Sequence, residues 1–226
     1  MSEIVVHHLE NSRSLRLLWL LEELGLEYEV REYKRNPKTM RAPRELSELH
    51  PLGKAPVVTV DGKVLAESGA IIESLLDRFD ESASLRPAGG DARDAFHYWM
   101  HYAEGSLMPV FLVRLILDNI KKAKLPFFVK PIAKGIVDKV DAAYTTPEME
   151  RHLPFIEAHL AGHAYFTGDE FSAADIQMFY NVDVLHLRGR LSKFPKMAAW
   201  LEKVKARPAY QAAEERGGAN QLPSMD

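Results

Sequence analysis

The chain of 226 residues contains no cysteine. This absence excludes disulfide bonds, and it excludes a thiolate nucleophile or a thiolate metal ligand supplied by the protein itself. Any thiol chemistry that the protein carries out therefore has to use a thiol on its substrate.

Long apolar runs and an excess of one charge are also absent. No run of about 18 uncharged apolar residues occurs, which argues against a membrane-spanning helix. Residues 1–6 lack a cationic, apolar leader, so we expect a cytoplasmic protein without stable membrane insertion. The net charge of −3 gives no reason to expect nucleic acid or an anionic membrane as the main partner.

A break in composition divides the chain. Residues 80–90, DESASLRPAGG, are polar and rich in proline and glycine, as is typical of a linker between domains. The pattern before the break mixes strands and helices, and the pattern after it is helical throughout. We therefore expect an α/β domain at residues 1–80, a linker at 81–90 and an all-helical domain at 91–226.

The first domain has the pattern of a thioredoxin-like fold. Residues 4–9 form a β-prone run, an apolar helical pattern follows up to Gly25, and residues 28–33 alternate like a second strand. A short helix is expected at 45–49. Val57–Val60 and Lys63–Ala66 then predict a hairpin closed by Asp61-Gly62. With the helix that follows, the predicted order is βαβαββα.

The stretch from residue 50 to residue 72 indicates a site for an anionic peptide. Pro56 precedes a strand, and we expect it to leave the Ala55 backbone on a sheet edge to which an extended peptide can add. Ser68 is the expected N-cap of the next helix. The first free N–H groups of that helix and its dipole favour a carboxylate there.

These residues resemble the glutathione-binding half of cytosolic glutathione S-transferases of the bacterial and fungal type. The resemblance is carried by HPLGKAPVV at 50–58 and LAESGAI at 65–71, and it extends over about residues 1–210. It implies that glutathione is a co-substrate, with no other cofactor. It also implies a cis bond before Pro56, and a tripeptide site formed by Lys54, the Ala55 backbone, Pro56, Glu67 and Ser68.

Three polar side chains compete for the catalytic position, where the redox members of the fold carry a cysteine. They are Asn11, Ser12 and Ser14. A hydroxyl at a helix start, beside a cationic neighbour, stabilises a bound thiolate over the thiol. In theta-like transferases the catalytic serine lies four residues before an arginine, and counting back from Arg16 gives Ser12. Zeta-like members place it at Asn11. We favour Ser12, although the residues leave Ser14 and Asn11 open.

The first long helix of the second domain, expected at 91–122 with an interruption near Met108-Pro109, carries further candidates. In several classes of the family an acid here reaches across a homodimer to the γ-glutamyl amine, which points to Glu104. His97 and His101 have a spacing that suits a metal, but HExxH is absent, and we expect no metal site.

Aromatic residues on the same helix are candidates for a pocket that holds a small hydrophobic electrophile. Helical spacing suggests Tyr98, Tyr102 and Phe111. Residues 125–132, LPFFVKPI, are apolar but broken twice by proline, so we expect a bent connection. We expect this segment to pack under the second domain. Alternatively, it forms part of the wall of the substrate site, or it contacts a membrane surface.

One motif in the second domain is structural. Ser172 and Asp175 have the spacing of a capping box, which predicts a helix start. The resemblance places a buried central helix there. Loss of the Asp175 carboxylate is expected to cost about 1–2 kcal/mol through the cap.

The resemblance implies a homodimeric transferase that conjugates the glutathione thiolate to small hydrophobic electrophiles. A glutathione-dependent peroxidase or disulfide reductase would use the same site. A transferase-fold interaction module without turnover is the third possibility.

Overall fold

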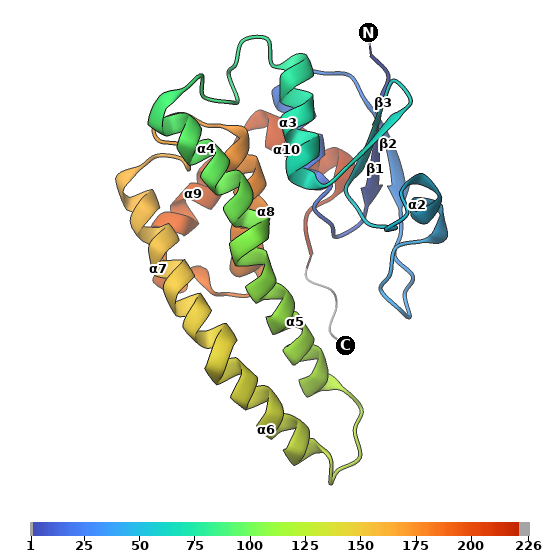
Figure 1. The fold of residues 1–226 in the computed structure, drawn as a ribbon, viewed down its shortest axis with the longest axis vertical. Coiled ribbons are helices and arrows are strands. Elements are labelled where there is room, and N and C mark those ends of the chain that lie inside the picture. The colour runs from blue at the N-terminus through green and yellow to red at the C-terminus, as the bar shows by residue number, and fades with distance from the viewer. Residues whose placement is uncertain (1, 222–226) are drawn as a thin grey trace.

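The computed structural model describes residues 2–221; Met1 and residues 222–226, the end of the expected helical domain, lie outside this range. A sheet with three helices comes first and a set of helices follows (Figure 1). The first part contains β1 (Ile4–Leu9), α1 (Leu15–Glu23), β2 (Glu29–Tyr33), α2 (Arg44–Leu49), β3 (Val57–Val60), β4 (Lys63–Ala66) and α3 (Ser68–Phe79). This is the predicted thioredoxin-like order, βαβαββα.

The four strands lie in the order β2-β1-β3-β4. β1 is parallel to β2 and antiparallel to β3, and β3 is antiparallel to β4. β3 is therefore an inner strand, and the expectation that the Ala55 backbone lies along a sheet edge is wrong. The ladder between β3 and β4 ends at the Val57–Ala66 pair, so Ala55 lies beyond the end of an inner strand.

Local sequence sets the turns of this domain. Asp61 and Gly62 both have positive φ, 49° and 79°, and they join Val60 to its ladder partner Lys63. Positive φ at both central residues is the hairpin turn that suits the twist of the strands. Gly25, with φ at 64°, follows α1, and the N–H of Leu26 bonds to the carbonyl of Leu21. This bond reaches back over the helix end as in a Schellman motif.

The second part opens with a long helical hairpin (Figure 1). One arm runs from α4 (Gly90–Tyr102) through a π-helical turn (Ala103–Leu107) into α5 (Met108–Lys122). The other runs from α6 (Lys130–Val140) through a second π-helical turn (Asp141–Thr145) into α7 (Thr146–Gly162).

Each π-helical turn directly precedes a helix that has a proline in its first turn, Pro109 or Pro147. A proline inside a helix clashes with the carbonyl four residues before it, and a wider turn relieves that clash. The interruption expected at Met108-Pro109 therefore lies just before it, at 103–107.

The remaining helices fold back on this hairpin. They are α8 (Ala173–Leu187), a 3₁₀ turn (Leu191–Lys193), α9 (Pro195–Lys205) and α10 (Pro208–Gly217). α8 is buried over most of its length, and α10 packs on α1 of the first part. Trp19 of α1 lies 5.3 Å from the Phe179 ring and 5.2 Å from the Tyr210 ring, centroid to centroid. One apolar core therefore runs through both parts of the chain.

The connection between α5 and α6 does not pack under the helices. The side chains of Phe127 and Phe128 are 83% and 65% exposed, and the connection forms the far end of the hairpin (Figure 1). The packing expectation is wrong because the two helices extend past the rest of the bundle, which leaves nothing for these residues to pack against.

The capping box at the start of α8 is confirmed, and the structure gives Asp175 a larger role. Its carboxylate accepts hydrogen bonds from the Ser172 N–H at 3.0 Å, the Phe166 N–H at 3.1 Å and the Trp200 indole N–H at 2.9 Å. Burial raises the pKa of Asp175 to about 6, against the lowering effect of these donors. The residue ties the helix start to two other segments.

We therefore expect Asp175→Ala to lower the free energy of unfolding by about 3 kcal/mol, more than a cap alone, because buried donors on Phe166 and Trp200 lose their acceptor. Chemical denaturation measures this. Ser172→Ala is the matched control and should cost about 1 kcal/mol. Equal losses for the two variants would contradict the tying role of the carboxylate.

Candidate active site

A small polar cleft of about 100 Å³ lies at the C-terminal end of β4 and the start of α3. It brings together the five residues of the first domain that the sequence assigned to tripeptide binding. Arg13, from the segment before α1, and residues from the segment before β3 complete it. The cleft is lined by Arg13, His50, Leu52, Lys54, Ala55, Pro56, Ala66, Glu67 and Ser68.

The backbone at the cleft departs from regular structure at two places. The Ala55–Pro56 bond is cis, as the resemblance implied, and Glu67 has a φ of 71°. A residue other than glycine with positive φ is strained, and such strain is concentrated at ligand sites. Lys54 is exposed and Ser68 is buried, so the cleft contains a solvent-exposed cation and a buried hydroxyl.

The expectation that Ser68 caps α3 is wrong. Ser68 is the first residue of the helix, and Glu67 occupies the N-cap position without a side-chain bond to the helix backbone. α3 therefore begins one residue earlier in the chain than expected, directly after Glu67 with its positive φ. The first N–H groups of α3 consequently have no side-chain cap, and they are available to an anion in the cleft.

Arg13 and His50 are cleft residues that the sequence interpretation did not assign. Arg13 lies between the two candidate serines, and His50 opens the HPLGKAP motif. Their positions beside the candidate serines and in this motif were the sequence signal that could have identified them. Together with Lys54 they give the cleft three basic side chains, which suits a peptide that carries carboxylates.

The candidate catalytic residues form a hydrogen-bonded chain before α1. The hydroxyls of Ser12 and Ser14 lie 2.7 Å apart, and the Ser14 hydroxyl lies 2.9 Å from His8 Nδ1. The Ser14 N–H also donates to the Ser12 oxygen at 3.2 Å. Burial lowers the pKa of His8, so the imidazole is neutral near pH 7.

The hydrogen bonds along His8, Ser14 and Ser12 can run in either direction. When His8 Nδ1 carries the proton, it donates to Ser14, Ser14 donates to Ser12, and the Ser12 proton is free for a ligand. The opposite tautomer turns the Ser12 proton toward Ser14. A change between the two arrangements moves the His8 proton from one ring nitrogen to the other and rotates both serine hydroxyl groups.

Burial distinguishes the three candidates. Ser14 is fully buried and Ser12 is 7% exposed. Asn11 is partly exposed, and its side-chain oxygen accepts from the Gln221 N–H at 3.0 Å. Ser12 therefore has a path to solvent that Ser14 lacks, and it directly precedes Arg13 of the cleft.

Glu104 holds two arginines of its own chain. Its carboxylate lies 2.5 Å from Arg13 Nη1 and 2.5 Å from Arg16 Nη1. Arg16 is 1% exposed, and its other terminal nitrogen donates to Asn181 Oδ1 at 3.1 Å. Desolvation raises the pKa of Glu104, but the two guanidinium groups outweigh it and hold that pKa below its ordinary value.

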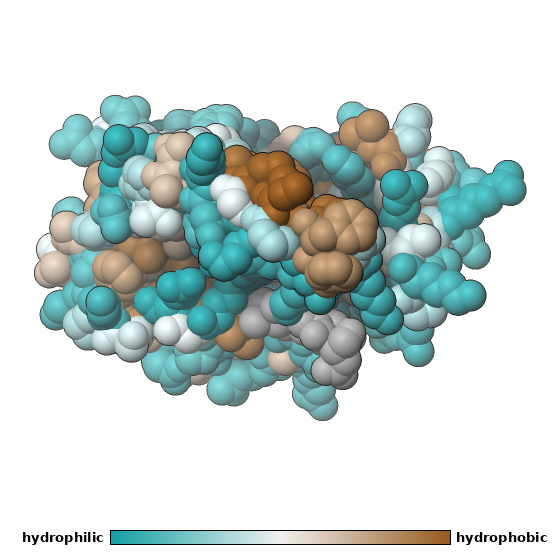
Figure 2. Space-filling model, turned by 90° about the horizontal axis from the view of Figure 1, so that it is seen from below, coloured by the Kyte–Doolittle hydropathy of each residue, from teal (hydrophilic) through white to brown (hydrophobic). Residues whose placement is uncertain are grey.

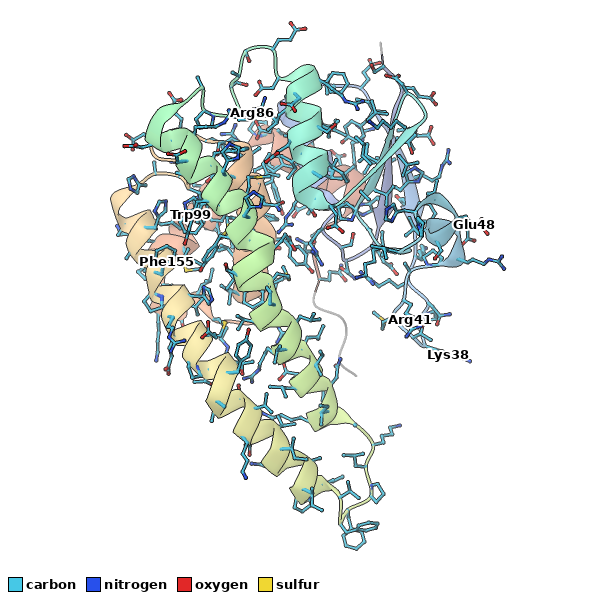
Figure 3. All side chains as sticks on the ribbon, viewed as in Figure 1. Lys38, Arg41, Glu48, Arg86, Trp99 and Phe155 are labelled. Carbon is cyan, nitrogen blue, oxygen red and sulfur yellow. The ribbon has the colours of Figure 1, made fainter. Side chains whose placement is uncertain are left out.

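The three aromatic residues expected to form an electrophile pocket do not come together. The Tyr98 and Tyr102 rings stack on each other, 5.6 Å apart, and both contact Phe155 of α7. Figure 3 shows Trp99 and Phe155 meeting between α4 and α7, where this cluster lies. Eight residues separate Phe111 from Tyr102, and five of them form the π-helical turn, so the two rings do not continue one face.

Phe111 instead lines a cavity of about 680 Å³ between α5, α7 and the end of α8. Met149, Leu153 and Leu185 are among its apolar neighbours there. The residues lining this cavity include none of those lining the cleft.

Within residues 2–221, no group of three or more His, Asp or Glu side chains is placed to hold a metal ion. No described helix has the length and apolar character needed to cross a membrane. His97 lies 3.9 Å from Glu73 and accepts a bond from Arg93 at 3.2 Å.

Comparison with known proteins identifies the class to which this fold and cleft belong. Residues 1–77 match the N-terminal domain of glutathione S-transferases, and residues 122–213 match a C-terminal domain of the same proteins. The solved structure of a glutathione S-transferase from Actinobacillus pleuropneumoniae superposes with a TM-score of 0.78 at 33% identity, covering 95% of this chain and 92% of that one.

Two fungal proteins are similar over nearly the whole chain. Glutathione S-transferase 1 of Saccharomyces cerevisiae is 35% identical over 225 residues, which cover 96% of each chain. Glutathione S-transferase 3 of Schizosaccharomyces pombe is 38% identical over 223 residues, 97% of this chain and 90% of the relative. The protein belongs to the glutathione S-transferase family.

The buried arginine gives a stability prediction. Glu104→Ala should lower the free energy of unfolding by about 3 kcal/mol, because it leaves the Arg16 guanidinium buried without its carboxylate. Arg13→Ala removes the partner that is 37% exposed and should cost less than about 1 kcal/mol. Similar losses in the two variants would contradict this assignment.

The same pair should make the protein sensitive to acid. Because the pKa of Glu104 is lowered in the folded state, its contribution is present above the ordinary glutamate value of 4.5 and is lost as pH falls below it. Chemical denaturation measures this: between pH 7 and pH 4, the free energy of unfolding should fall less for Glu104→Gln than for the wild type.

Proposed function

We propose that this transferase conjugates the glutathione thiolate to small hydrophobic electrophiles, with Ser12 as the group that meets the sulfur. The observation that carries the proposal is the position of the polar cleft, which adjoins the serine-bearing approach to α1. The protein has no thiol of its own, so the nucleophile is the sulfur of the bound tripeptide.

The tripeptide lies extended across the end of the inner strand β3. The Ala55 backbone, beyond the last ladder pair, hydrogen-bonds the central cysteinyl unit. Lys54 binds the glycyl carboxylate, while Glu67, Ser68 and the open start of α3 hold the γ-glutamyl end. Pro56 fixes the turn that presents Ala55.

Catalysis then consists of positioning and of stabilising an anion. The thiol of glutathione releases its proton to water, and Ser12 donates a hydrogen bond from its hydroxyl to the resulting thiolate. The start of α1 and the Arg13 guanidinium favour the thiolate over the thiol. The hydrogen bonds from Ser14 to Ser12 hold the donor in place. The thiolate attacks the electrophilic carbon, forms the carbon–sulfur bond and displaces the leaving group, without a covalent enzyme intermediate.

The assembly and the location belong to the same proposal. A homodimer would place a second chain beside the first, and since Glu104 is held by Arg13 and Arg16 of its own chain, its reach toward a partner's ligand requires the bond to Arg13 to open. We place the protein in the cytoplasm, because the reaction consumes reduced glutathione and that compartment keeps it reduced. The division into domains at 1–80 and 91–226 stays a prediction.

The direct test is titration of the protein with reduced glutathione by calorimetry, followed by assays with an aryl halide and with an organic peroxide. We expect binding, and faster turnover of the aryl halide. Faster turnover of the peroxide would favour the peroxidase alternative. Absence of binding at millimolar glutathione would favour an interaction module.

Ser12→Ala should lower kcat/KM by about a hundredfold, as loss of one donor to a developing anion does. Glutathione affinity should change little, and the pKa of the bound thiol, followed by thiolate absorbance against pH, should rise. Asn11→Ala is the matched control and should retain most activity. Loss of activity in Asn11→Ala with retention in Ser12→Ala would reverse the assignment.

Lys54→Ala should raise the KM for glutathione by about ten- to a hundredfold, since a hydrogen bond between charged groups contributes about 1.5–3 kcal/mol. The kcat at saturating glutathione should stay near the wild-type value. Lys63→Ala, on the nearby hairpin but outside the cleft, is the control. A fall in kcat without a change in KM would contradict a role in binding.

A further inference from the structure

The end of the helical hairpin carries an exposed apolar surface. We define the tip as residues 119–137, which include the end of α5, the connection and most of α6. Its exposed apolar side chains, with their exposed fractions, are Ile120 39%, Phe127 83%, Phe128 65%, Ile132 64% and Ile136 59%. Figure 2, seen along the long axis from the hairpin end, shows an apolar patch facing the viewer with hydrophilic residues around it.

The hairpin does not need these side chains for its own packing. α5 and α6 contact each other, and Leu117 and Val137 are the buried apolar residues near the tip, at 5% and 0% exposure. Phe127 and Phe128 lie in the connection between the helices and contact each other edge to face, 5.5 Å apart. Large exposed apolar patches usually mark a contact surface.

The charge of the tip is opposite to that of the remaining chain. Residues 119–137 contain five lysines and no aspartate or glutamate. The net charge of the whole chain is −3, so the remainder carries −3 − 5 = −8. The five are Lys121, Lys122, Lys124, Lys130 and Lys134.

One acidic side chain pairs with two of these lysines at the edge of the tip. Within residues 2–221, Asp138 is paired with Lys121 at 3.8 Å and with Lys134. Lys124 and Lys130, which flank the phenylalanine pair in sequence, are both exposed.

Exposed phenylalanines surrounded by lysines match the chemistry of an anionic bilayer surface. Aromatic and aliphatic side chains enter the boundary between headgroups and acyl chains, while lysines attract acidic headgroups. The patch lies at the extreme end of the long axis (Figure 1), where a flat surface can reach it without touching the rest of the molecule. A narrow tip suits a stable protein interface less well, because such an interface buries about 800 Å² on each partner.

We propose that the tip is a docking surface for membranes that contain anionic lipids. Phe127 and Phe128 insert at the headgroup level, and the lysines bind the acidic headgroups. The polar cleft lies at the start of α3, and α3 lies far from the hairpin end (Figure 1), so the cleft stays open to water while the tip is docked. This inference stands independently of the role assigned to Ser12.

Vesicle flotation with the full chain tests the proposal. The protein should float with phosphatidylcholine vesicles that contain phosphatidylglycerol and should stay behind with phosphatidylcholine alone. Binding should weaken as salt is raised, because exposed charges are screened. Absence of binding to the anionic vesicles at millimolar lipid, or equal binding to both kinds, would overturn the proposal.

Two pairs of variants separate the apolar and the charged contributions. Phe127→Ser with Phe128→Ser should reduce binding by at least about tenfold, whereas Leu112→Ser, on α5 away from the tip and 56% exposed, should leave it unchanged. Lys124→Glu with Lys130→Glu should abolish the preference for anionic vesicles, and Lys63→Glu with Lys193→Glu, which reverses the same charge elsewhere, should not. Equal effects of test and control variants would overturn the proposal.

Sedimentation without lipid distinguishes a second copy of the chain as the occupant. The double phenylalanine variant should have the same mass in solution as the wild type and the same glutathione conjugation activity. A change from dimer to monomer in that variant would assign the tip to self-association and would overturn the membrane proposal.

Discussion

The ion pair between Arg16 and Glu104 is the constraint on which the arrangement of this molecule depends. A guanidinium on the first helix of the thioredoxin-like domain is fully buried, and its carboxylate partner comes from the π-helical turn in the helical domain. Asn181 of the central helix α8 completes the set, donating to the Ala103 carbonyl at 2.8 Å while it accepts from Arg16. Burying a cation is costly unless such partners are in place, so the two domains are fixed relative to each other.

The same ion pair also positions the segment before α1 that carries the candidate serines. Arg13, three residues before Arg16, shares the Glu104 carboxylate and lines the cleft. The segment that carries Ser12 and Ser14 is thus held from the helical domain through Arg13 and Arg16, and from the sheet through His8. A thioredoxin-like fold without cysteine keeps the helix start that favours an anion, and in the proposed mechanism a serine hydroxyl takes the place of the thiol.

The two ends of the molecule carry different properties. The core joins both domains around α1 and α8, while the hairpin extends beyond it with a basic, apolar tip. The small net charge of the chain conceals this separation, because the lysines of residues 119–137 offset acids that lie elsewhere. A net charge summed over the chain therefore gave no indication of an anionic surface as partner, whereas its distribution does.

Features specified by neighbouring residues were predictable from the sequence. The strands Val57–Val60 and Lys63–Ala66 were predicted to the residue, since a β-branched run and an Asp-Gly turn act locally. The capping box at Ser172 is local in the same way. The residues of the first domain that we propose to bind the tripeptide fall within residues 54–68, so one motif contains them.

The sequence by itself determined the thioredoxin-like order, the helical second domain and the part of the cleft that residues 54–68 form, because each depends on contacts within a few positions. Only the tertiary structure decided that β3 is an inner strand, that Glu104 holds Arg13 and Arg16, and that Tyr98 and Phe111 lie apart. It also decided that Phe127 is exposed rather than packed. These outcomes depend on which distant segments meet, and no local pattern of residues encodes that.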